Sequence, residues 1–179
     1  MMNNKLTRTL AKVLTAVTAV TSTTGLAADL NVNDTAPTFT TQTHEGKPFD
    51  LQSRKGQWTV LYFYPKADTP GCTKQACAFR DSIDKIRKEG ADVFGVSVDS
   101  VKDQAAFHKK YHLNFVLLAD AKADVATVYG VKMPVVKVAK RWTFVLDPEL
   151  KIRTILKDVD PVKDSERIAT LISELKVQK

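Results

Sequence analysis

The chain is poor in the residues that build metal centres. Its 179 residues include only 2 Cys and 3 His, which excludes a four-cysteine zinc site or a cysteine-liganded iron-sulfur cluster and leaves few ligands for a multinuclear centre. Glycine and proline are also scarce, with 7 of each, so the chain is neither collagen-like nor a low-complexity polymer. We therefore expect a globular protein without a metal centre, while redox chemistry at a cysteine stays open.

Acidic residues are absent from the first 28 positions. This stretch carries Lys5, Arg8 and Lys12, an apolar run over 13–20 and small residues near its end, which is the order found in a secretory signal peptide. We expect residues 1–27 to be cleaved, with a cut after Ala28 as the alternative, and residues 28–179 to be exported to the periplasm. A retained helix, an uncleaved anchor and an organelle transit peptide share these features and stay open.

The charge of the chain does not indicate a nucleic-acid or membrane partner. The formal net charge is +7, but without the three basic residues of the leader 24 basic residues face 20 acidic ones, which leaves +4. No four Lys or Arg residues are consecutive, so nucleic-acid binding is not expected. With a hydrophobic content of 44% the chain is too polar for a multi-span membrane protein, and no stable membrane association is expected.

Strand and helix patterns alternate along the mature part. Residues 58–64 and 91–98 are β-branched and aromatic runs typical of buried strands, and residues 114–118 form a shorter candidate. Residues 141–147 and 151–156 flank a turn that contains proline, which predicts a hairpin.

The helices lie between these strands and have recognisable ends. We expect a helix that has Cys72 in its first turn and runs to about Lys88, one capped by Ser100, one over 121–129 and a last one capped by Asp160. Ile168, Leu171, Ile172 and Leu175 give the last helix an apolar stripe. This order predicts a single domain of the α/β class: a thioredoxin-like three-layer sandwich with a central mixed sheet flanked by helices.

Both cysteines, Cys72 and Cys77, follow the first buried strand. The turn at Pro70 places Cys72 in the first turn of the expected helix, where unpaired N–H groups and the helix dipole favour the thiolate. The alternative is a static disulfide in an exported protein. On one helix, however, cysteines five residues apart have Cα atoms roughly 8.7 Å apart, beyond the limit of about 7 Å for a bridge. A bond would require the first turns to unwind, which favours a catalytic disulfide.

The residues around Cys72 resemble a known active-site signature. The spacing Pro65-x-x-x-Thr69-x-x-Cys72, with Cys77 five residues later, resembles the signature of peroxiredoxins, and of the peroxiredoxin Q or bacterioferritin comigratory protein group in particular. The resemblance continues through residues 115–120 and 141–147 and covers roughly residues 32–176 in the family's order.

The resemblance implies a role for each matching residue. Cys72 is the expected peroxidatic cysteine, which is oxidised to a sulfenic acid, and Thr69 is expected to hold the peroxide. The backbone N–H groups of Gly71 and Cys72 are expected to stabilise the charge that develops on the reacting oxygens. Pro65 is expected to cover the pocket, and Arg141 to orient the peroxide and stabilise the thiolate.

The resemblance also implies a reaction cycle that needs no cofactor, and the partners of that cycle. Cys77 is the expected resolving cysteine, and thioredoxin or a thioredoxin-like protein the expected reductant of the Cys72–Cys77 disulfide. The substrates are expected to be hydrogen peroxide and organic hydroperoxides, and the chain to be a monomer, with a weak dimer as the alternative. A thioredoxin-like disulfide oxidoreductase or redox-controlled binding protein is the alternative function, and the absence of Cys-x-x-Cys counts against it. An exported structural domain with inert cysteines is the third.

Overall fold

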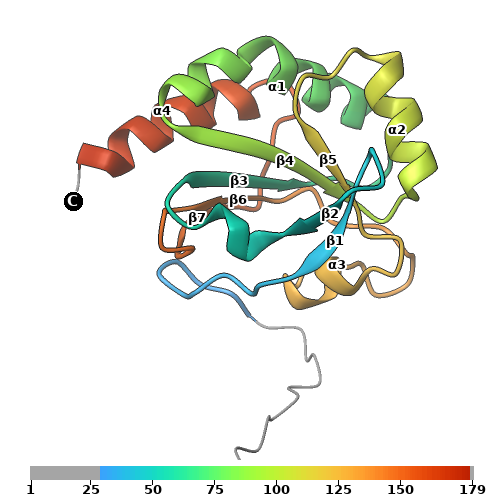
Figure 1. The fold of residues 1–179 in the computed structure, drawn as a ribbon, viewed down its shortest axis with the longest axis horizontal. Helices are drawn as coiled ribbons and strands as arrows, with labels where there is room; N and C mark the ends of the chain where they lie inside the picture. The colour runs from blue at the N-terminus through green and yellow to red at the C-terminus, as the bar shows by residue number, and fades with distance from the viewer. Residues whose placement is uncertain (1–28, 178–179) are drawn as a thin grey trace, which may run out of the picture.

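A seven-stranded mixed sheet runs through the computed structural model, which describes residues 29–177 (Figure 1). The predicted leader and its cleavage site lie outside the described residues. The strands follow the order β2-β1-β5-β4-β3-β6-β7 across the sheet, and their bounds are β1 Thr40–Thr43, β2 Pro48–Asp50, β3 Trp58–Phe63, β4 Ala91–Ser97, β5 Val116–Ala119, β6 Thr143–Leu146 and β7 Ile152–Leu156.

The centre of the sheet is built from strands that are apolar along their whole length. Every residue of β3 is buried, because helices or loops cover both faces of the sheet at this strand. β3 pairs in parallel with β4, in the register Val60 opposite Val93, and β4 pairs in parallel with β5. On its other side β3 pairs antiparallel with β6, with Tyr62 opposite Thr143.

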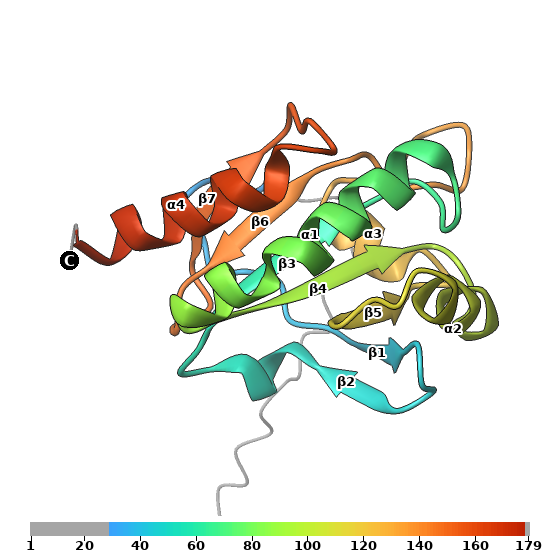
Figure 2. The same cartoon turned by 90° about the horizontal axis from the view of Figure 1, so that it is seen from above.

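Three helices cover one face of this sheet and one short helix lies on the other (Figures 1 and 2). Their bounds are α1 Pro70–Lys88, α2 Val101–Lys110, α3 Asp124–Val128 and α4 Asp164–Val177, and the 3-10 helix η1 spans Leu51–Arg54. α1, α2 and α4 pack on one core cluster that contains Phe79, Phe107 and Ile168. α3 packs with Phe63 and Phe144 on the other. The predicted three-layer α/β sandwich with a mixed sheet is thereby confirmed.

Most predicted elements occur where the sequence places them. The two buried strands, the hairpin of β6 and β7 and the long helix after residue 69 are all present. Ser100 caps α2 as expected, since its Oγ accepts a hydrogen bond from the backbone N–H of Asp103 at 3.2 Å.

Several predicted boundaries were wrong, and among them β6 spans Thr143–Leu146 rather than 141–147. β5 begins at Val116 rather than at 114, and Arg87 donates a hydrogen bond to the free carbonyl of Asn114. α3 begins at Asp124, because Ala123 adopts the left-handed conformation that ends helical geometry. α4 begins at Asp164.

α4 begins later than predicted because Asp160, the predicted cap, caps a turn that precedes the helix. The Asp160 carboxylate accepts hydrogen bonds from the N–H groups of Val162 and Lys163, and these residues form a turn before the helix. The pair β1 and β2 was not predicted at all, since its strands of 4 and 3 residues are half exposed and carry no apolar run. Within residues 29–177 no helix combines the length and the hydrophobicity that crossing a membrane requires.

Candidate active site

The first turn of α1 places Cys72 in the core beneath the carboxyl end of β3. Thr69 is the N-cap residue, Pro70 occupies the first turn where a missing N–H costs nothing, and the N–H of Thr73 donates to the carbonyl of Thr69 at 2.8 Å. The Cys72 side chain is only 1% exposed. Its thiol is free. Because Cys72 is in the first turn of the 19-residue helix α1, the thiol lies at the positive end of the helix dipole.

Arg141, remote in sequence, lies against Cys72. It immediately precedes β6, and the pairing of β6 with β3 brings it to the end of the sheet where α1 begins. Its Nη2 lies 3.4 Å from the Cys72 sulfur, and its Nη1 donates to Oε1 of Gln75 at 2.6 Å. Gly71 leaves room for this approach, because a Cβ there would lie 3.2 Å from Nη2 of Arg141.

A buried polar network binds the Gln75 side chain on the side away from Arg141. The Oδ2 atom of Asp164 accepts hydrogen bonds from Nε2 of Gln75 at 2.8 Å and from Oγ1 of Thr143 at 2.9 Å. Burial raises the pKa of the Asp164 carboxyl, and the hydrogen bonds from Gln75 and Thr143 oppose that rise. Sequence reasoning missed these three residues. Nothing in a single sequence distinguishes Asp164 from the solvent-exposed acidic residues that begin many helices.

The loop between β3 and α1 carries the remaining predicted site residues. Pro65 and Thr69 are half-buried, and the Thr69 hydroxyl donates to the carbonyl of Lys66 at 2.9 Å rather than capping α1. The loop is held by Asp99, whose carboxylate accepts from the N–H of Ala67 at 2.8 Å. Thr69, Gly71 and Cys72 thus lie at the start of α1 with Arg141 against Cys72, and Pro65 lies in the loop that leads into this helix.

Cys77 lies on the same uninterrupted helix as Cys72, as predicted. It is a free, partly buried thiol, and an ideal helix places the two Cα atoms roughly 8.7 Å apart. A disulfide between them therefore requires α1 to unwind locally. Cys77 lines an open groove of about 560 Å³ between α1 and the start of α4, together with Lys74 and Val162.

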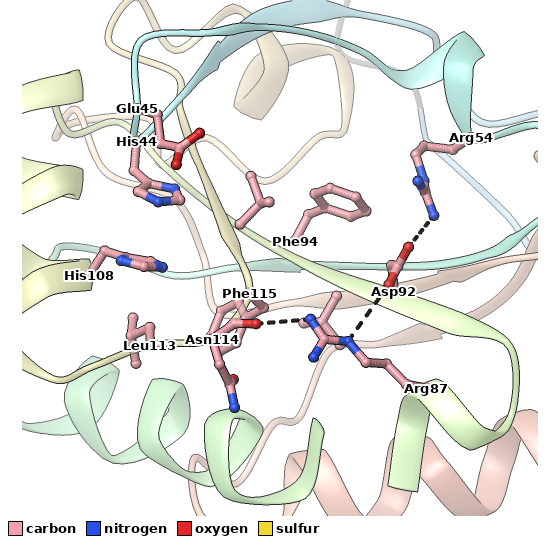
Figure 3. A pocket seen from close by; sticks show the side chains of 12 residues that line it. His44, Glu45, Arg54, Arg87, Asp92, Phe94, His108, Leu113, Asn114 and Phe115 are labelled. Carbon is pink, nitrogen blue, oxygen red and sulfur yellow. Dashed lines mark hydrogen bonds and ion pairs between the residues drawn. The ribbon is translucent and has the colours of Figure 1, made fainter. Parts of the chain in front are cut away.

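A separate cavity of about 400 Å³ contains neither cysteine (Figure 3). His44, which follows β1, stacks on His108 of α2 with ring centroids 3.8 Å apart. Burial lowers the pKa of both imidazoles. At the other end of the cavity, Asp92 forms ion pairs with Arg54 and Arg87.

Comparison with known proteins agrees with this geometry. The model of the AhpC/TSA family matches residues 32–155. The chain is 41% identical to the chloroplastic peroxiredoxin Q of Sedum lineare over 151 residues, 83% of this chain and 81% of that protein. The crystal structure of peroxidoxin BcpB from Mycobacterium tuberculosis superposes with a TM-score of 0.75 at 32% identity, covering 80% of this chain and 97% of that one.

A second solved structure belongs to the same group of proteins. It was described for insights into the alkyl peroxide reduction activity of the bacterioferritin comigratory protein of Xanthomonas campestris, and it has a TM-score of 0.73 at 27% identity over 76% of this chain and 91% of that one. The family match spans more than half of the chain, and Arg141 contacts the buried thiol of Cys72. The chain therefore belongs to the AhpC/TSA family, as a thioredoxin-fold thiol peroxidase of the peroxiredoxin Q and bacterioferritin comigratory protein group.

Proposed function

We propose that the protein reduces hydrogen peroxide and organic hydroperoxides with Cys72 as the attacking thiol and Cys77 as the resolving thiol. The contact of Arg141 Nη2 with the Cys72 sulfur at 3.4 Å carries the proposal. This fixed cation and the start of α1 face the same sulfur. The guanidinium and the helix N-terminus both stabilise the negative charge that develops on the peroxide oxygens when the Cys72 sulfur attacks them.

In the first step the Cys72 thiolate attacks one oxygen of the hydroperoxide. An S–O bond forms as the O–O bond breaks, so sulfur is oxidised to a sulfenic acid by two electrons and the peroxide is reduced. The leaving oxygen takes a proton from water and departs as water or, from an organic substrate, as an alcohol.

Thr69, Gly71, Cys72 and Pro65 shape this step. The Thr69 hydroxyl donates its hydrogen bond to the carbonyl of Lys66. Its oxygen is therefore left to accept a hydrogen bond from the O–H of the hydroperoxide. The backbone N–H groups of Gly71 and Cys72 are in the unpaired first turn of α1 and can donate to the reacting oxygens. Pro65 covers the pocket and limits further oxidation of the sulfur.

In the second step Cys77 resolves the sulfenic acid. The Cys77 sulfur attacks the Cys72 sulfur, an S–S bond forms, the S–O bond breaks and water leaves with the thiol proton. The first turns of α1 unwind to allow it. A thioredoxin-like dithiol then reduces the disulfide by exchange, and the groove beside Cys77 gives such a partner access to this side of α1.

Intact mass and free-thiol titration test the cycle directly. The reduced protein, mixed with one equivalent of hydrogen peroxide, is expected to lose both thiols and two hydrogens within seconds. Cys72→Ser is expected to lose no thiol, and Cys77→Ser to stop at a sulfenic acid that a thioredoxin-like reductant cannot turn over. Unchanged thiols in the natural protein would overturn the proposal.

We propose further that residues 1–27 direct export and that the mature enzyme works in the periplasm. The basic, acid-free start followed by an apolar run supports this assignment. Intact mass of the protein recovered from a bacterial periplasmic fraction is expected to correspond to a chain that starts at Ala28 or Asp29. A full-length chain in the cytoplasm would contradict it.

A further inference from the structure

The contact between Gln75 and Asp164 joins the second turn of α1 to the start of α4. Gln75 is fully buried and Asp164 is 3% exposed, so neither side chain can exchange its partner for water without the helices moving. The bond is 2.8 Å long, and the same carboxylate oxygen also accepts from Thr143 of β6. One carboxylate therefore anchors α1 to two other elements of the fold.

Both ends of the Gln75 amide are used. Its Nε2 donates to Asp164, and its Oε1 accepts from Nη1 of Arg141 at 2.6 Å. Because the carboxylate can only accept and the guanidinium can only donate, the orientation of the amide is determined. The planar guanidinium, held at Nη1, then presents Nη2 to the Cys72 sulfur at 3.4 Å. Asp164 thus orients Arg141 without touching it.

Gln75 also lies within the segment that must unwind. It is three residues after Cys72 and two before Cys77, inside the continuous helix α1. Bringing the two sulfurs together moves this part of the backbone, and with it Gln75 leaves both Asp164 and Arg141. The contact between Gln75 and Asp164, which positions the site for reaction with peroxide, must therefore break when the Cys72–Cys77 disulfide forms.

We propose that Asp164 is a positioning residue that acts through Gln75: it keeps Arg141 on Cys72 in the reduced enzyme and restrains the opening of α1 that the disulfide requires. The inference rests on the proposed two-cysteine cycle. It implies opposite effects on the two steps, because losing the contact loosens Arg141 but also loosens α1. A purely structural residue would lower stability without separating the two rates.

Rapid-quench mass spectrometry of the full chain measures the two steps separately. Asp164→Ala is expected to slow sulfenic acid formation about tenfold and to speed disulfide formation by about the same factor, which corresponds to losing one or two buried hydrogen bonds. Asp164→Asn keeps an acceptor oxygen in the position of Oδ2, so both rates are expected to stay within about twofold of the natural ones. Excess peroxide is also expected to overoxidise Asp164→Ala less, since its sulfenic acid is resolved sooner.

Two further variants separate the restraint from general damage. Gln75→Met breaks the contact from the other side with little change of volume and is expected to shift the two rates in the same opposite directions, even if Asp164→Ala fails to fold. Thr143→Val removes the other donor to Asp164 and leaves the contact with Gln75, so it is expected to lower stability without separating the rates.

The outcomes distinguish this inference from the proposed cycle. If the natural protein forms no Cys72–Cys77 disulfide, the cycle itself is wrong. If it forms the disulfide but Asp164→Ala and Gln75→Met move both rates in one direction or neither rate, Asp164 does not restrain α1. Equal behaviour of Asp164→Asn and Asp164→Ala would also overturn the inference, because the acceptor oxygen would then be irrelevant.

Discussion

At the scale of single residues, Gly71 allows Arg141 to reach Cys72. A Cβ at this position would lie 3.2 Å from Nη2 of Arg141, which forces the guanidinium away by a few tenths of an ångström. Gly71→Ala is therefore expected to slow peroxide reduction about tenfold, while stability does not fall because alanine favours helices over glycine. Stopped-flow kinetics and a thermal melt of the same sample check both parts. An unchanged rate would mean that the approach is not needed.

The geometry of the Arg141 guanidinium, with its two terminal nitrogens, is expected to matter for peroxide reduction as well as its charge. Its two terminal nitrogens have different partners, the Gln75 amide and the Cys72 sulfur. Arg141→Ala is expected to slow sulfenic acid formation about 10²-fold, as the loss of one preorganised donor does elsewhere, and Arg141→Lys to recover only part of the loss. Lys140→Ala, at the neighbouring position, serves as the control. A natural second-order rate constant in Arg141→Ala would remove this residue from the site.

At the scale of elements, α1 is expected to exist in two conformations. Reduced, it is one helix over Pro70–Lys88; oxidised, it cannot keep both cysteines in ideal helical positions, since their Cα atoms are then roughly 8.7 Å apart. Hydrogen exchange of residues 70–79 is expected to become faster after one equivalent of peroxide, while α4 stays protected near its buried residues. Cys72→Ser treated with peroxide gives the baseline. Equal exchange in both forms would show that the helix accommodates the bond.

The pair β1 and β2 is attached to α2 through a stack of two histidines (Figure 3). Burial lowers the pKa of His44 and His108 below their ordinary value of 6.5. Below about pH 6.5 the unfolded chain therefore binds more protons at these residues than the folded one does, and the free energy of unfolding decreases as the pH falls.

Thermal melts between pH 5 and 8 test this linkage. The natural protein is expected to lose stability as the pH falls through this window, and His108→Phe, which keeps an aromatic ring but cannot titrate, is expected to lose less. The exposed His112 offers the control substitution His112→Gln. Identical pH profiles for the natural protein and His108→Phe would exclude the stacked pair as the source.

At the scale of the whole molecule, the core beneath α1 contains an unsatisfied hydroxyl. Within residues 29–177 the buried Oη of Tyr62 has no hydrogen-bond partner, and the ring fills space left by Gly95, where a Cβ would lie 2.6 Å from Oη. Tyr62→Phe removes the unsatisfied group and is expected to stabilise the protein by about 1 kcal/mol. Gly95→Ala is expected to destabilise it by about 1–3 kcal/mol through overpacking.

Urea unfolding of the two variants beside the natural chain provides the measurement. Peroxide reduction by each variant, measured on the same samples, serves as a check that the folded state is intact. A destabilised Tyr62→Phe would indicate that the hydroxyl has a partner such as an ordered water.

The central elements could be predicted because residues close together in the sequence specify them. An unbroken apolar run specified β3 and β4, a serine and an aspartate three residues apart specified the start of α2, and the proline before Cys72 specified the start of α1. The edge strands β1 and β2 could not be predicted in this way, since they are short and polar and are held by pairing with β5 and with each other.

The fold class, the reactive start of α1 and the motif that contains Cys72 could all be inferred from the sequence, because each depends on residues close together in the chain. The family resemblance named Arg141 as a site residue, but the contacts that complete the site, and the part that Gln75 and Asp164 have in it, came only from the tertiary structure. Arg141 is brought to Cys72 by the pairing of β6 with β3, and Asp164 is brought to Gln75 by the packing of α4 on α1. Such contacts arise from burial shared between distant segments, and a buried aspartate has no local pattern that separates it from an exposed one.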